Sequence, residues 1–91
     1  MARHRKILEA LKGSGQRITP QRVMVLSAMA DQPGHIGVEG IFQKVYQGYP
    51  YIDVATVYLT LQWLKGLHLV TELDVGGASR YELVTPEMEA H

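Results

Sequence analysis

The spacing of apolar residues changes along this chain, from a helical repeat before residue 65 to strand-like runs after it. In residues 38–47 apolar side chains recur every three or four positions, which predicts a helix. Residues 69–74 and 78–84 are rich in β-branched and aromatic side chains, and Gly76-Gly77 between them predicts a hairpin turn. Helices followed by a hairpin restrict the chain to a small set of folds.

Two more helices are marked by their ends. In residues 2–13 a narrow apolar face lies among charged side chains, and Gly13-Ser14-Gly15 stops the helix. Thr19 is a typical N-cap and Pro20 suits the first helical position, so a second helix is expected to run to about residue 31. This second helix is expected to bury Val23, Leu26 and Ala30.

Residues 53–65 predict a further helix, with Asp53 as its N-cap and two unlike faces. The expected core seam consists of Val54, Val57, Leu61 and Leu64. The opposite face consists of Ala55, Thr56, Leu59, Gln62 and Trp63, with Tyr58 on its flank. Small residues at the start of this face allow a close approach to a partner, and the first two turns are where a DNA-binding helix contacts base edges.

These elements in this order predict a mainly α (α+β) fold. The expected architecture is a winged helix-turn-helix, with three or four helices followed by a two-stranded antiparallel β-hairpin wing. The helix of residues 53–65 is then the one presented outward, directly before the wing.

The composition is that of a single globular domain. Of the 91 residues, 46% are hydrophobic and 20% are charged, which argues against a disordered chain. No apolar run approaches the roughly 20 residues that cross a membrane, so we expect a cytoplasmic protein with no membrane partner. Cysteine is absent, which excludes disulfides, thiolate catalysis and cysteine-bound zinc within these residues.

The net charge is zero, but the charges are unevenly distributed. Residues 1–22 contain six basic side chains and one acidic side chain, Glu9, so their net charge is +5. Residues 23–91 contain three basic side chains and eight carboxylates, so their net charge is −5. A localised basic segment neutralises nucleic-acid phosphates even in a neutral molecule. The alternative is an ordinary solvated helix, and charge alone leaves both interpretations open.

Four short motifs stand in order along the chain. They are Gly15-Gln16-Arg17-Ile18-Thr19-Pro20-Gln21-Arg22, then Gly34-His35-Ile36, then Ile52 with Ala55-Thr56-Val57-Tyr58, then Arg80-Tyr81-Glu82-Leu83. Together they resemble the ferric uptake regulator family of metal-dependent bacterial transcription factors. The resemblance implies a DNA-binding domain, here residues 1–84, followed by a dimerisation and metal-binding domain that makes a homodimer. Residues 85–91 would begin the hinge to that second domain, which is absent from this chain.

The resemblance also implies which residues contact double-stranded DNA. Tyr58 corresponds to a tyrosine that contacts thymine in the major groove, at the groove-facing start of its helix. Basic residues at the end of the first helix and around the second motif match positions that hold phosphates without contacting bases. The predicted DNA contacts are Lys12, Arg17, Arg22, Ala55, Thr56, Tyr58 and Thr60.

Some residues depart from the family pattern. Leu59 stands where the family usually has arginine or lysine, and leucine cannot replace the bidentate contact of arginine to guanine. Gly37 replaces the usual N-cap, Gly40 lies inside a helix at a cost of about 1 kcal/mol relative to alanine, and His68 occupies a position that can require a left-handed backbone. Leu59 therefore predicts a different or weaker DNA site, or another ligand.

A metal site is implied by the resemblance as well. His35 and Glu82 correspond to two ligands of the family's regulatory site, and His91 stands where the following histidine cluster would begin. Imidazole and carboxylate ligands suit zinc, iron(II) or manganese. We therefore expect a divalent metal cofactor in the intact protein and no tight binding by residues 1–91 alone. Taken without the resemblance, His35 is an ordinary loop residue and Glu82 a solvated strand residue.

No enzyme is expected, because the chain has no nucleophile elbow, no HExxH helix and no glycine-rich loop that opens a helix after a strand. The expected function is the DNA-binding domain of a metal-responsive bacterial transcriptional regulator, a repressor in its complete form, that binds an AT-rich inverted repeat. The alternative is a winged-helix protein-interaction module, with Leu59 and Trp63 forming an exposed apolar patch.

Overall fold

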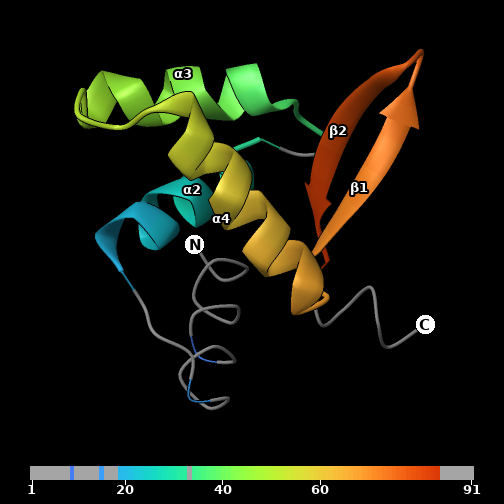
Figure 1. The fold of residues 1–91 in the computed structure, drawn as a ribbon, viewed down its shortest axis with the longest axis horizontal. Coiled ribbons are helices and arrows are strands. Elements are labelled where there is room, and N and C mark those ends of the chain that lie inside the picture. The colour runs from blue at the N-terminus through green and yellow to red at the C-terminus, as the bar shows by residue number, and fades with distance from the viewer. Residues whose placement is uncertain (1–8, 10–14, 16–18, 33, 85–91) are drawn as a thin grey trace.

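A computed structural model describes residues 9, 15, 19–32 and 34–84, which form three helices followed by a two-stranded sheet. The elements are α2 (Pro20–Ala30), α3 (Val38–Gly48), α4 (Val54–Gly66), β1 (Val70–Val75) and β2 (Ala78–Leu83). Figure 1 shows α4 crossing in front of α2 and α3, with the β-hairpin beside it. The arrangement confirms the predicted winged helix-turn-helix. The helix expected at residues 2–13 and the segment 85–91 lie outside the described residues.

Helix α2 starts as the sequence predicts but buries a different face. The hydroxyl oxygen of Thr19 accepts the backbone N–H of Arg22 at 3.3 Å, as expected of an N-cap. The expected stripe was only partly correct, because Val23 and Ala30 are half-buried. The buried residues are Val25, Leu26, Ala28 and Met29. Helix α2 packs against both α3 and α4, so it buries a wider face than one seam.

Helix α3 begins at Gly37, which makes no side-chain cap. A Cβ built on Gly40 would lie 2.9 Å from Cγ1 of Ile36, closer than side-chain atoms pack. Ile36 is itself buried and forms an antiparallel bridge with Tyr81 of β2. Glycine at position 40 is therefore favoured because Ile36 lies close to its backbone, and this contact outweighs the low helix propensity of glycine.

Helix α4 places three of its four predicted seam residues in the core: Val57, Leu61 and Leu64 are fully buried. Val54 was expected in the same seam but is 40% exposed, because the first turn extends beyond the elements that cover the rest of the helix. His68, just past the end of α4, has a φ of 63°, which confirms the left-handed backbone expected there.

The wing is an antiparallel pair in which Val70 lies opposite Leu83 and Val75 opposite Ala78. Gly76 and Gly77 have φ values of 61° and 87°, which only glycine adopts without strain and which suit a tight hairpin turn. Tyr81, on β2, is 1% exposed and completes a core shared by the helices and the sheet. In the described part of the chain no helix is long and apolar enough to cross a membrane.

Candidate functional site

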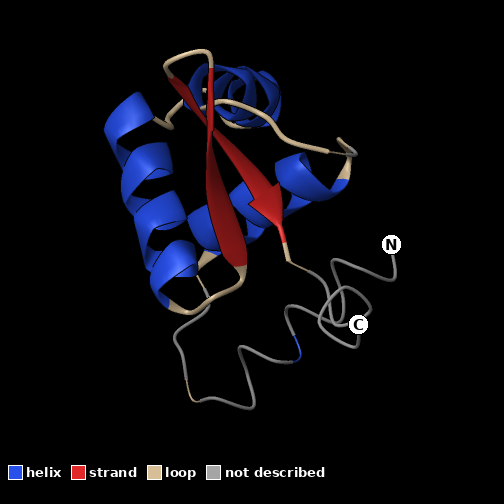
Figure 2. Cartoon of the chain, turned by 90° about the vertical axis from the view of Figure 1, so that its right-hand side faces the viewer, coloured by secondary structure: helices blue, strands red, loops and turns tan. Residues whose placement is uncertain are grey.

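The outward face of α4 carries exposed side chains near the start of the helix. Asp53 fixes its start, since Oδ1 accepts the backbone N–H of Thr56 at 2.7 Å. This hydrogen bond lowers the pKa of the Asp53 carboxyl. Along the first two turns Ala55 and Tyr58 are exposed and Leu59 is 65% exposed. Figure 2 shows the helices packed around the two-stranded sheet from a second side.

One predicted contact residue does not belong to this surface. Thr60 is 6% exposed, and its hydroxyl donates a hydrogen bond of 2.8 Å to the backbone carbonyl of Thr56. A threonine hydroxyl has one proton to donate, so Thr60 has no donor left for a base. Thr60 is therefore not expected to donate a hydrogen bond to a base. Thr56 is half-buried, while Ala55 and Tyr58 remain accessible.

Beside Leu59 lies a hollow of about 250 Å³ between the first turn of α2 and the second turn of α4. It is lined by Thr19, Gln21, Arg22, Thr56, Leu59 and Thr60. The hollow opens next to the exposed residues of α4, so a partner that lies along α4 also reaches the start of α2. No sequence pattern indicated this hollow, because it depends on how the two helices cross.

Arg22 joins the two helices at this hollow. Its guanidinium carbon lies 3.6 Å from the centre of the Trp63 ring, a cation–π contact. The contact covers one face of the indole, and Trp63 is half-buried. Trp63 therefore does not form the wide exposed apolar patch with Leu59 that the alternative interpretation required.

The other basic residues predicted at this surface, Lys12 and Arg17, lie outside the described residues. Lys65, at the end of α4, donates to Glu72 Oε1 at 2.8 Å, which raises the pKa of Lys65 and lowers that of Glu72. Ser79 donates to the other oxygen of Glu72 at 2.6 Å. Lys65 therefore holds the wing to α4 through a carboxylate, and its charge is largely compensated there.

The two predicted metal ligands lie at a second edge, where the loop before α3 meets β2. Ile36 and Tyr81 exchange both backbone hydrogen bonds, at 2.9 and 2.7 Å. In an antiparallel pairing the next residues outward, His35 and Glu82, are neighbours in register. Nε of Arg80 donates to Nδ1 of His35 at 3.2 Å, so the neutral imidazole carries its proton on Nε2. His35 must therefore give up this hydrogen bond or change tautomer before a ring nitrogen can bind a metal.

Two ligands do not complete a coordination sphere. Among the described residues there is no group of three or more histidine, cysteine or acidic side chains placed to hold a metal ion. The third predicted ligand, His91, lies outside the described residues. His35 and Glu82 therefore fit a metal site only if residues elsewhere in the intact protein complete it.

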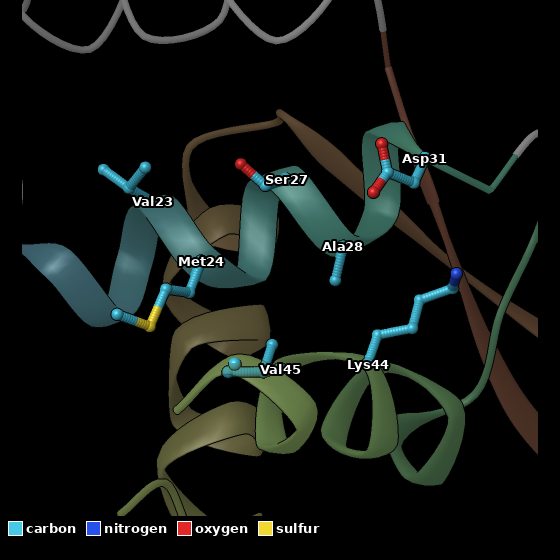
Figure 3. A pocket seen from close by; sticks show the side chains of 8 residues that line it. Val23, Met24, Ser27, Ala28, Asp31, Lys44 and Val45 are labelled. Carbon is cyan, nitrogen blue, oxygen red and sulfur yellow. The ribbon is translucent and has the colours of Figure 1, made fainter. Parts of the chain in front are cut away.

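A second hollow, of about 270 Å³, lies between α2 and α3 (Figure 3). Its lining is mostly apolar and includes Val23, Met24 and Val45. Lys44 extends from α3 toward the end of α2 that carries Asp31. This hollow lies away from the outward face of α4, and no sequence pattern indicated it.

Comparisons with known proteins agree with the fold and with the motifs. The model of the ferric uptake regulator family matches residues 13–91. The peroxide operon regulator of Bacillus subtilis (strain 168) is 38% identical over 90 residues, which cover 96% of this chain and 62% of that protein. The chain thus spans less than two thirds of the length of this relative. The relative's name is that of a regulator, in agreement with the expectation that this chain is not an enzyme.

Two solved structures match the fold closely. The peroxide-sensing regulator PerR from Streptococcus pyogenes superposes with a TM-score of 0.82 at 26% identity, over 91% of this chain and 58% of that one. A zinc uptake regulator complexed with zinc and DNA superposes with a TM-score of 0.78 at 25% identity, over 89% and 53%. The family model matches most of the length of this chain, so the chain belongs to the ferric uptake regulator family.

Proposed function

We propose that this chain is the DNA-binding domain of a metal-responsive bacterial transcriptional regulator, a repressor in its intact form, that binds an AT-rich inverted repeat through the major groove. Residues 1–84 form this domain, and residues 85–91 begin the connection to a dimerisation domain. The proposal rests above all on α4, whose start is capped by Asp53 and whose outward face is open. The match to a regulator that was solved with DNA supports it.

The outward face of α4 supplies the groups that contact bases. Tyr58 is 48% exposed and offers both an aromatic ring and a hydroxyl. Ala55 and Thr56, one turn earlier, carry side chains small enough for α4 to lie deep in the groove. Asp53 caps this turn, in which Ala55 and Tyr58 are exposed and Thr56 is half-buried.

Phosphate contacts come from basic residues nearer the start of the chain. Residues 1–22 carry a balance of +5, and Lys12 and Arg17 belong to this segment. Arg22 lines the hollow beside α4 and stacks over Trp63, so its positive charge lies next to the proposed DNA-binding face. Because the contacts are ionic, affinity falls as salt increases.

The intact protein also binds a divalent metal, zinc, iron(II) or manganese, through His35, Glu82 and ligands beyond the described residues, among them His91. The donor types suit these ions. When bound, the metal supplies a cross-link between this domain and the one that follows. Through that second domain the protein forms a homodimer, which matches the two-fold symmetry of an inverted repeat.

A protein-interaction module remains the second candidate, and Leu59 is the observation that favours it, since a 65% exposed leucine suits an apolar partner. The Arg22 stack over Trp63 reduces the apolar surface available for it. A protein partner would be lost on Leu59→Glu, and the chain would then show no salt-dependent binding to DNA.

Fluorescence anisotropy with a labelled AT-rich inverted-repeat duplex tests DNA binding at several salt concentrations. Tyr58→Ala is expected to weaken binding about tenfold, because each good base contact contributes about 1–3 kcal/mol. Tyr46→Ala is the matched control, since Tyr46 is 46% exposed but lies on α3. Equal losses in both variants, or no salt-dependent binding by the native chain, would contradict the proposal.

Metal binding is tested by calorimetric titration of zinc or manganese into a protein extended past residue 91. His35→Ala is expected to lower the affinity at least tenfold, because a ligand is lost. His68→Ala is the control, since His68 is exposed and lies at the far end of α4. If both variants bind the metal like the native protein, His35 is not a ligand.

A further inference from the structure

The outward face of α4 contains no basic side chain. Residues 54–64 include neither lysine nor arginine, and Lys65 is held by Glu72 at the wing. Arg22, at the neighbouring hollow, keeps its guanidinium plane over Trp63. The usual contact to guanine, a bidentate arginine, therefore cannot come from this helix.

Leu59 is the exposed aliphatic side chain on the second turn of this face. It lies one turn after Ala55, on the same side of α4, and is 65% exposed. Leu61 and Leu64, on the same helix, are fully buried in the core. Leu59 is therefore not a core residue, and its side chain can gain burial only against a partner that lies along α4.

The surroundings of Leu59 are rich in methyl groups. The adjoining hollow is lined by three threonines, Thr19, Thr56 and Thr60, each with a γ-methyl. Thr60 has already donated its hydroxyl proton to the carbonyl of Thr56, and the hydroxyl oxygen of Thr19 accepts the N–H of Arg22. Two of the three hydroxyl groups therefore already hydrogen-bond within the protein, and the methyl groups next to Leu59 offer contacts to an apolar group on the partner.

In the major groove, the 5-methyl of thymine is the apolar group that a base pair presents, whereas the other base-edge groups are hydrogen-bond donors or acceptors. We propose that Leu59, with the hollow beside it, recognises this thymine methyl and makes the chain prefer A·T pairs where an arginine-bearing helix prefers guanine. This inference rests on the proposed DNA-binding function and assigns the base that one position of α4 selects.

The test starts from a duplex selected out of a randomised library by the 91-residue chain at low salt. Each thymine is then replaced in turn by uracil, which removes only the methyl group and keeps base pairing. For the native chain, uracil at one position per half-site is expected to weaken binding about three- to fivefold, the loss from one apolar carbon. For Leu59→Ala the same replacement is expected to have no effect.

Two further variants sharpen the test. Leu59→Arg, selected against the same library, is expected to change the preferred base at that position from thymine to guanine. Val75→Ala shortens an exposed apolar side chain on the wing. This variant is expected to lose as much affinity on uracil replacement as the native chain does. Because Leu59 and Val75 are outside the core, unchanged melting temperatures are expected and serve as the folding check.

The outcomes separate this inference from the proposed function. If the native chain binds the selected duplex in a salt-dependent way but tolerates uracil everywhere, the Leu59 inference is wrong while DNA binding stands. If uracil weakens the native chain and Leu59→Ala equally, another side chain recognises the methyl. A 5-methylcytosine·guanine pair presents the same methyl group, so if it binds as tightly as the A·T pair at that position, the proposed preference for A·T is wrong. If no duplex is selected, both proposals fail.

Discussion

Helices α3 and α4 have similar lengths, 11 and 13 residues, but their first turns are held in different ways. At α4 a single side chain, Asp53, caps the backbone of Thr56. At α3 the N-cap is Gly37, which contributes no side-chain bond, and the start is held by the packing of Ile36 against Gly40. A side-chain cap leaves the outer face of a helix accessible to a partner. Where the first turn is held by packing against another segment, that segment covers the turn.

The two starts also serve different parts of the proposed function. The capped turn of α4 presents Ala55 and Tyr58, the groups proposed to contact bases. The packed start of α3 fixes the segment that carries His35, next to Glu82 on β2. A change in one start is therefore expected to alter DNA binding, and a change in the other to alter metal binding and stability.

The largest expected effect on stability comes from Gly40→Ala. Its Cβ would lie 2.9 Å from Cγ1 of the buried Ile36, so overpacking exceeds the gain in helix propensity. We expect the free energy of unfolding to fall by about 1–2 kcal/mol in urea denaturation. Gly48→Ala, in the last position of the same helix, meets no neighbouring atom and should not destabilise the protein. Equal stability of Gly40→Ala and the native chain would show that the close approach is not tight.

A smaller effect is expected from Asp53→Ala, which removes the cap of α4 and should lower the melting temperature by about 4–8 °C at pH 7. The cap is complete above the ordinary pKa of the carboxyl, 3.8, and is lost as pH falls through the lowered pKa of the folded state. The difference between the two proteins should therefore shrink in acid. Asp53→Asn keeps an acceptor oxygen at every pH, so a large loss in this variant at pH 7 would contradict a simple cap.

The smallest effect, and a stabilising one, is expected at the far end of α4. His68 has a φ of 63°, a conformation that costs a non-glycine residue about 1–2 kcal/mol. His68→Gly should raise the free energy of unfolding by about 0.5–1 kcal/mol after the greater chain entropy of glycine is counted. His68→Ala keeps the strained backbone and should bring no gain. A gain of equal size in both variants would point to the imidazole and not to the backbone.

Much of the fold could be predicted because its signals are local. Thr19, Asp53 and the Gly76-Gly77 turn each act on neighbouring backbone atoms, and each stands where the sequence placed it. The errors concern which side chains the helices bury. Val54 is exposed although it continues the seam of α4, and Val23 is half-buried on α2, because the coverage of a helix depends on where its neighbours end.

The candidate site was predictable only in part, for the same reason. The outward face of α4 follows from helical spacing, and its exposed residues Ala55, Tyr58 and Leu59 were expected there. Thr60 lies close to the core seam and is buried. The Arg22 contact with Trp63 and the Arg80 contact with His35 join residues far apart in sequence, so no local pattern could reveal them.

Backbone amide chemical shifts of the 91-residue chain, recorded while an AT-rich inverted-repeat duplex is added, test the central claim that the outer face of α4 is the DNA-binding surface. We expect the largest shift changes on residues 55–59, with the wing turn at residues 76–77 nearly unchanged. Largest changes in the wing turn, or along the hollow between α2 and α3, would contradict it.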